Sequence, residues 1–268
     1  MKLSKMKDIL RKVRRVGLWA LGILFILFAL QITALAFPQV IVSEKTACGS
    51  VTIYTDRVAE FDIGLLAKEV EDRLIGSRFY DSSRNNKVFY FQNQNLYRCF
   101  ARLAMVTSKA QGFALSVFGN SYVDQTRILE LASFTRGVPK YGIWEGSPAH
   151  IIAHEIGHLY LTEQIGREEW MNLPHWKQEG FPEYIANIAS IRKDNLATLA
   201  NRIKVLNDDQ MWDWSNRWDR IHFEAELLVE FLLDVQGNTV EQIVADSVTR
   251  EETLSTMLDW SKSQESGI

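Results

Sequence analysis

The sequence predicts an α+β protein that carries a transmembrane helix at its N-terminus. Three observations support this fold class. Residues 16–37 are apolar and uncharged, residues 46–145 mix strand-like alternation with helical spacing, and residues 146–268 show mainly helical spacing. About 230 residues follow the apolar run, which suits one compact unit of two subregions, 46–145 and 146–268, around a cleft. The net charge of −3 does not indicate nucleic-acid binding, and no pattern sets the oligomeric state.

The N-terminal region is predicted to be a membrane anchor. Residues 1–15 form a basic tail in which only Asp8 is acidic, and residues 16–37 contain no charged side chain. Such a run is long enough to cross a bilayer as one helix. The basic tail predicts a cytoplasmic N-terminus, so residues 46–268 are expected to be extracytoplasmic. Ala34-Leu35-Ala36 resembles a signal-peptidase site, but the apolar run is longer than a usual signal segment, which favours an uncleaved anchor.

The first subregion shows both strand and helix signals. Residues 51–54 alternate like a strand, and residues 87–91 are a second strand candidate. Residues 63–74 have helical spacing, with Asp62 as a possible N-cap and Gly76 as a possible stop. Residues Phe113–Val123 are expected to form a hairpin around its central glycine. The chain has two cysteines, Cys48 and Cys99, which could form one disulfide in an oxidising compartment.

The second subregion contains the most informative motif. The run His154–His158 spells H-E-I-G-H, which fits H-E-x-x-H. On a helix, His154 and His158 lie about one turn apart on one face, so both imidazoles can reach one metal ion. Glu155 points to a neighbouring part of that face, where it can hold and deprotonate a metal-bound water. The alternative is a buried pair of histidines without a metal.

Local signals place the motif on a helix. Ser147 is a good N-cap, and Pro148 is favoured at the first helical position. The helix is expected over about 148–164, with Gly166 just beyond its end. The apolar residues of this segment would bury the helix in a core, as a metal-binding helix requires.

A second motif lies downstream and carries a family resemblance. Residues Trp176–Phe181 resemble the W-x-x-E-G-F stretch of zinc aminopeptidases, and with H-E-x-x-H they resemble the gluzincin metallopeptidases over about 145–240. The resemblance implies a zincin-like domain around a zinc cleft, with Glu179 as the third Zn²⁺ ligand. Glu183 would then orient a ligand histidine; its alternative is a solvated helix carboxylate. Pro182 departs from the small residue usual in this motif, and is tolerable if the helix begins at about 180–181.

Three further histidines are candidates for the cleft. Hydrolysis at zinc needs a donor for the developing oxyanion, and related peptidases use a Tyr or a His from a later helix. No Tyr follows Tyr184, so His222 is the candidate, on a predicted amphipathic helix that leads to Gly237. An ordinary surface or packed histidine is the alternative. His150 could lie behind the metal site or in the pocket wall, and His175 is expected to be a loop residue.

These observations predict a membrane-anchored zinc metallopeptidase acting on a peptide or protein. Zn²⁺ would be held by His154, His158 and Glu179, and Glu155 would activate a zinc-bound water. The hairpin Phe113–Val123 is the candidate edge that pairs with the substrate backbone, or else ordinary sheet core. The G-x-M-x-N signature is missing, which argues against a true aminopeptidase. The alternative function is a catalytically silent surface module that binds a protein or cell-envelope partner. The tryptophans Trp212, Trp214 and Trp218 are expected to pack.

Overall fold

The computed structural model describes residues 3–42, 44–59, 61–126, 128, 147–187, 198–208, 217–245 and 247–266. Within them the architecture is α+β, with one five-stranded sheet and a long apolar helix at the N-terminus, which confirms the predicted class. Trp212 and Trp214 lie outside the described residues, as does the side chain of Trp218.

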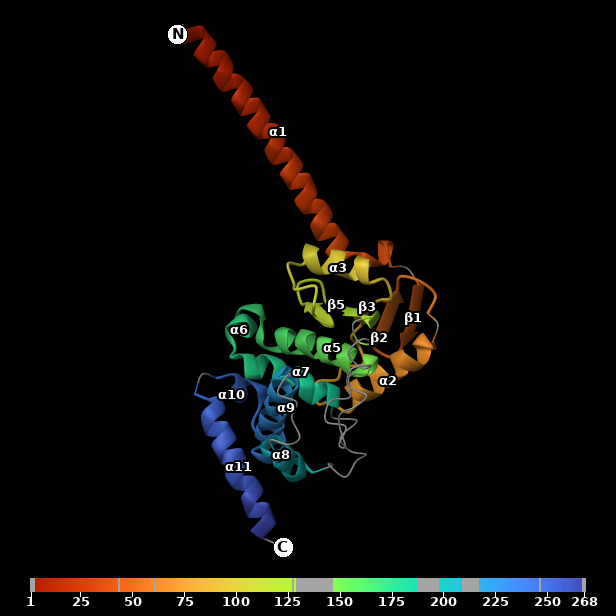
Figure 1. Cartoon of the computed structure of the whole chain (residues 1–268), viewed down its shortest axis with the longest axis vertical. Helices are drawn as coiled ribbons and strands as arrows, with labels where there is room; N and C mark the ends of the chain where they lie inside the picture. The colour runs from red at the N-terminus through yellow and green to blue at the C-terminus, as the bar shows by residue number, and fades with distance from the viewer. Residues whose placement is uncertain are drawn as a thin grey trace.

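Helix α1 (Leu3–Ala36) projects away from the rest of the protein (Figure 1). Its segment Arg11–Ala36 is long and apolar enough to cross a membrane, judged by length and composition. The helix is followed by a short 3-10 turn, η1 (Pro38–Val40), that leads into the sheet. The sequence therefore predicted this helix correctly.

The sheet has the strand order β1-β2-β3-β5-β4. Strands β2, β3 and β5 are parallel to one another, whereas β1 and β4 pair antiparallel at the two edges. The predicted strands and hairpin are confirmed, and β4 and β5 are the two arms of the hairpin. The strand bounds are β1 (Glu44–Cys48), β2 (Val51–Thr55), β3 (Asn86–Phe91), β4 (Gly112–Leu115) and β5 (Asn120–Asp124).

The two faces of the sheet support two separate cores. Side chains alternate along β3, so that Val88 and Tyr90 face one core while Phe89 and Phe91 face the other. The smaller core lies under α3 (Gln94–Leu103) and includes Leu35 from the end of α1. Residues before the predicted domain start at 46 thus contribute to the packing of the sheet.

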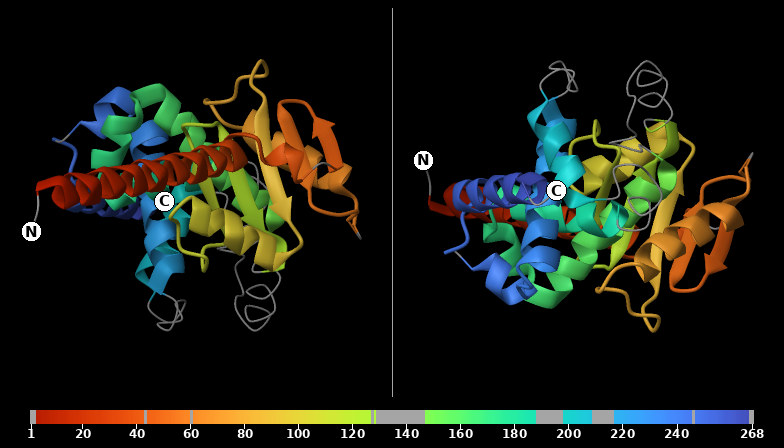
Figure 2. Two further views of the ribbon diagram at one scale, coloured as in Figure 1. Left: turned by 90° about the horizontal axis from the view of Figure 1, so that it is seen from above. Right: turned by 90° about the horizontal axis from the view of Figure 1, so that it is seen from below.

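The larger core lies on the opposite face and contains most of the helices. Helix α5 packs on β4 and β5, α7 packs on α5, α9 packs on α7, and α8 and α11 cover α9 (Figure 1). Seen from above, α1 is nearest the viewer, and seen from below α11 is nearest (Figure 2). The helices of this part are α2 (Ile63–Ile75), α5 (Pro148–Ile165), α6 (Arg167–Asn172), α7 (His175–Asn187), α8 (Leu199–Asn207), α9 (Arg217–Glu230), the π-helical turn η5 (Phe231–Val235), α10 (Val240–Val244) and α11 (Arg250–Ser266).

The cysteines do not pair in this fold. Cys48 is partly buried at the end of β1, whereas Cys99 is exposed on α3, and both are free thiols. Cys48 packs against the larger core, whereas Cys99 lies on the helix that covers the smaller core on the other face of the sheet. The disulfide that the sequence allowed is therefore absent.

Two glycines bring the three central helices into close contact. A Cβ at Gly157 would lie 2.7 Å from the Cα of Pro182, and a Cβ at Gly180 would overlap the carbonyl oxygen of Ala225. Backbone atoms cannot move aside as a flexible side chain can. These glycines therefore set the distances from α5 to α7 and from α7 to α9.

We expect Gly180→Ala to lower the free energy of unfolding by about 1–3 kcal/mol, because overpacking forces α7 and α9 apart. In an open helix the same change raises stability by about 1 kcal/mol, so the sign of the effect is diagnostic. Urea denaturation of the full-length protein in detergent measures it. Gly22→Ala in α1, where a Cβ meets no atom within 4 Å, is the control. An unchanged midpoint for Gly180→Ala would contradict the close packing.

Candidate metal site

Helix α5 presents the H-E-x-x-H motif to the interior. The side chain of Ser147 caps the helix by accepting a hydrogen bond from the backbone N–H of His150 at 3.1 Å, as the sequence predicted. His154 and His158 then project from one face, with their Nε2 atoms 3.1 Å apart. Both rings are held in a largely buried setting, with side chains 10% and 14% exposed.

Helix α7 brings a carboxylate to these two histidines. Oε2 of Glu179 lies 3.3 Å from Nε2 of His154 and 3.5 Å from Nε2 of His158. Ligand atoms about 2.0–2.1 Å from a tetrahedral zinc ion lie about 3.3 Å from one another. Two imidazole nitrogens and one carboxylate oxygen at these separations fit one face of such a coordination sphere.

The start of α7 differs from the sequence expectation. The helix begins at His175, where the carbonyl of Pro174 accepts hydrogen bonds from the N–H groups of Lys177 and Gln178, and not near 179–181. Pro182 therefore lies inside the helix, where it has no N–H to donate to the preceding turn. Glu179 belongs to the second turn of α7 and not to its first.

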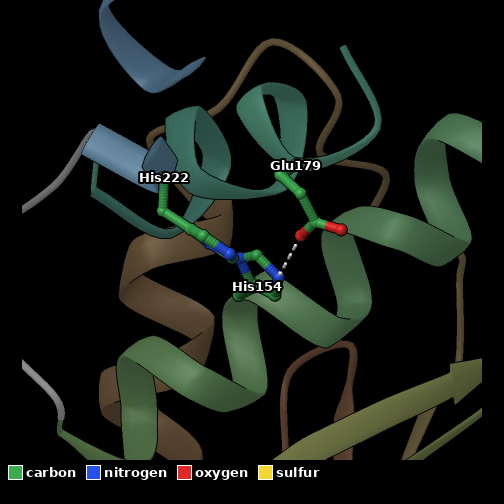
Figure 3. A group of neighbouring side chains, drawn as sticks. All are labelled: His154, Glu179 and His222. Carbon is green, nitrogen blue, oxygen red and sulfur yellow. Dashed lines mark ion pairs between the residues drawn. The ribbon is translucent and has the colours of Figure 1, made fainter. Parts of the chain in front are cut away.

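His222 on α9 faces the same site. His154, Glu179 and His222 each offer one ligand atom, and these atoms lie within 4.8 Å of one another, so this group could hold a metal ion (Figure 3). The rings of His154 and His222 are stacked with their centroids 5.8 Å apart. The ligand atoms of His154, Glu179 and His158 lie closer together, at 3.1–3.5 Å, than those of His154, Glu179 and His222, which lie within 4.8 Å. His222 is thus placed beside the metal ligands, and its role as an oxyanion donor stays a prediction.

Glu183 joins three histidines from two helices. Its carboxylate lies 3.0 Å from Nε2 of His150, 3.2 Å from Nδ1 of His154 and 2.9 Å from Nδ1 of His222. The residue is 2% exposed, so it is not a solvated helix carboxylate. A carboxylate on Nδ1 fixes the orientation of an imidazole and leaves Nε2 for a metal or a substrate.

The buried charges of the site stabilise one another. Burial alone would lower the pKa of His154, but Glu183 and Glu179 raise it well above its usual value. Burial would raise the pKa values of Glu179 and Glu183, but the neighbouring histidines lower both well below the usual range. Both carboxylates are therefore charged at neutral pH, as a metal ligand and a partner of ligand histidines need to be.

Glu155 lies on the side of α5 that faces the sheet. The residue is 7% exposed, and burial raises the pKa of its carboxyl. A Cβ at Gly112, the first residue of β4, would come within 2.7 Å of Oε1 of Glu155. The glycine thus leaves room for this carboxylate beside an edge strand. Sequence reasoning missed Gly112, because nothing local links it to a helix residue more than forty positions later.

The remaining histidines differ in burial. His150 is fully buried behind the site, where it contacts Glu183. The side chain of His175 is 52% exposed, with Nε2 3.8 Å from Oε1 of Glu179. His175 lies in the first turn of α7 and not in a loop, because this helix starts earlier than expected.

A polar network behind the site was also missed by sequence reasoning. The side-chain amide of Asn187 on α7 donates to Glu226 on α9 at 2.8 Å and lies 3.5 Å from Glu183. Arg202 on α8 pairs with Glu226 at 3.0 Å and also with Glu230. Asn187, Arg202 and Glu226 are buried and Glu230 is partly buried, so the network ties α7, α8 and α9 together directly behind Glu183.

Neither the models of known protein families nor the curated proteins include a match to this chain.

Proposed function

We propose that this protein is a zinc-dependent peptide-bond hydrolase of the gluzincin type, anchored in a membrane by α1 with its main domain outside the cytoplasm. One observation carries the proposal. Nε2 of His154, Nε2 of His158 and Oε2 of Glu179 lie within 3.1–3.5 Å of one another, next to the buried Glu155. This donor set and its spacing suit zinc better than the oxygen-rich cages of magnesium or calcium.

The chemistry divides between the metal and the protein. A bound Zn²⁺ would act as a Lewis acid and make water nucleophilic at neutral pH. Glu155 takes the proton of the attacking water and passes it to the leaving amine, a task that suits a carboxyl whose pKa is raised by burial. Nδ1 of His222 donates to the ionised Glu183, so Nε2 of the doubly protonated ring is the atom that donates a hydrogen bond to the carbonyl oxygen as it gains charge.

Strand β4 is the proposed binding edge for the substrate. It is the last strand of the sheet and pairs with β5 along one side. An extended peptide can add to such an edge through main-chain hydrogen bonds. The position of Gly112 beside Glu155 supports this proposal, because a peptide paired with β4 would pass close to the general base.

Metal content and peptide cleavage, measured on the full-length protein in detergent, test the proposal. We expect one zinc per chain in the wild type. Glu179→Ala should lose the zinc, because only two of its three protein ligands, the two histidines, remain. Glu163→Ala, which removes an exposed carboxylate from α5, is the matched control and should keep its zinc. Zinc without cleavage of a peptide library would favour the silent binding module. A folded wild-type protein without zinc would overturn the metal site.

A further inference from the structure

The last turns of α1 are built into the folded domain. The carbonyl of Leu35 accepts hydrogen bonds from the side chains of Asn120 at 3.0 Å and Tyr122 at 2.7 Å, and all three residues are buried. One turn earlier, the side-chain amide of Gln31 donates to the carbonyl of Leu103 on α3 at 2.6 Å. The end of α1 is therefore fixed to the sheet and to α3, and is not a free tether.

This attachment shortens the part of α1 that is available to cross a bilayer. Between the basic tail and Gln31 lie residues 16–30. These roughly fifteen residues make about 23 Å of helix, whereas the hydrocarbon core is about 30 Å thick. A helix that spans with this segment must draw the attached surface of the domain into the headgroup layer, or thin the bilayer around it.

The surface around the end of α1 has the composition that such a position requires. Large apolar side chains are exposed there, including Val40 at 80% and Met105 at 89%, and the basic side chains on α3 and in the segment after it are exposed as well. The chain has no acidic residue between Asp81 and Asp124. We call this surface the α3 face; its apolar members are Phe37, Val40, Ile41, Met105 and Val117, and its basic members are Arg98, Arg102 and Lys109.

A groove separates the membrane helix from α3. It has a volume of about 720 Å³ and is lined by Leu24, Leu27, Phe28, Leu30, Gln31 and Leu103. The lining is apolar except for Gln31. A hydrocarbon chain fits such a lining better than water does, because water would find few hydrogen-bond partners along it.

We propose that the α3 face rests in the headgroup layer of an anionic phospholipid leaflet. Basic side chains bind lipid phosphates, and apolar side chains beside them enter the boundary with the acyl chains. This inference goes beyond the proposed hydrolysis and rests on one part of it, the span of α1. Helix α11 lies at the opposite end of the molecule (Figure 1), so the contact would orient the metal site relative to the bilayer.

The exposed thiol of Cys99 on α3 provides a native site for a reporter. Full-length Cys48→Ala protein is labelled at Cys99 with an environment-sensitive fluorophore and placed in nanodiscs. The discs contain either phosphatidylcholine alone or phosphatidylcholine mixed with phosphatidylglycerol, each with a lipid-borne nitroxide quencher. We expect a blue shift and strong quenching in the anionic discs. A label at Gln264→Cys on α11, with both native cysteines replaced, should show neither.

Charge reversal separates this contact from the anchor. In Arg98→Glu, Arg102→Glu, Lys109→Glu the quenching at Cys99 in anionic discs should fall to its level in phosphatidylcholine discs, whereas Lys262→Glu on α11 should change nothing. Far-UV circular dichroism reports folding of the variants, and zinc content tests the hydrolase separately. A water-exposed label in anionic discs, or equal quenching in both lipids, overturns the proposal. Release of the full-length chain from membranes by alkaline carbonate overturns it together with the anchor.

Discussion

Replacement of Glu155 by glutamine is expected to reduce peptide hydrolysis by about 10²–10⁴-fold while the metal stays bound. Glutamine has nearly the shape of glutamate, but it cannot accept the proton of the attacking water. Glu155 is not one of the three converging ligand atoms, so the change leaves His154, His158 and Glu179 in place. Loss of turnover without loss of zinc is therefore the signature of a general base.

The measurement pairs zinc content with turnover of the best peptide from a library. Glu179→Ala serves as the contrast, because it should lose both metal and activity. Glu163→Ala, on the exposed side of the same helix, should lose neither. If Glu155→Gln keeps full turnover, Glu155 is not the base. If it loses zinc, Glu155 supports the ligand geometry and not the proton transfer.

The sequence predicted those features of the site that depend on neighbouring residues in one helix. The spacing of His154 and His158 on one helical face depends on the helix period alone, and the cap at Ser147 follows from its side chain. Glu179 lies on another helix, so its assignment depended on a motif resemblance and not on physics. The bounds of α7 were wrong, since Pro174 rather than Pro182 stands at the helix start.

Features that depend on tertiary packing could not be predicted. Glu183 contacts histidines from two other helices, and which histidines it reaches is set by the crossing of α5, α7 and α9. That crossing depends on Gly157 and Gly180, whose missing side chains carry no signal of what they approach. The pairing of the two cysteines likewise depends on a distance that no spacing gives.

The N-terminal helix illustrates the same limit. Ala34-Leu35-Ala36 fits a signal-peptidase site by residue size alone. In the fold, Leu35 is buried and its carbonyl accepts two hydrogen bonds from β5. Cleavage after Ala36 would leave the side chains of Asn120 and Tyr122 without the buried Leu35 carbonyl as acceptor, which costs stability. The packing thus supports the uncleaved anchor over the cleaved signal peptide.

At about pH 8.5, loss of the Arg202 guanidinium is expected to destabilise the protein by about 3–5 kcal/mol, because it leaves buried, ionised carboxylates without a cation. Arg202 pairs with Glu226 and Glu230, and the side chains of Arg202 and Glu226 are 4% and 3% exposed. Burial raises the pKa of Glu226 to about 8, although Arg202 lowers it. Burial also raises the pKa of Glu230, although Arg202 lowers it.

The sign of the pH dependence follows from these shifts. Between the unfolded pKa, about 4.3, and the raised folded pKa, the native state binds more protons than the unfolded chain. The stability that protonation of Glu226 contributes is therefore fully present below about pH 4.3 and is lost as the pH rises through about 8. Without Arg202 the folded pKa values rise further, so Arg202→Ala should lose more stability at about pH 8.5 than at about pH 5.

Chemical denaturation of the full-length protein at the two pH values measures this difference. The matched control removes all three charges together, in Arg202→Met, Glu226→Gln, Glu230→Gln. This variant should recover most of the lost stability and should lose the pH dependence, because no buried charge remains unpaired. Equal destabilisation of Arg202→Ala at both pH values would mean that the packing of the arginine stem, and not its charge, holds α8 to α9. Because Asn187 links Glu226 to Glu183, zinc affinity measured on the same variants shows whether this network also holds the metal ligands in place.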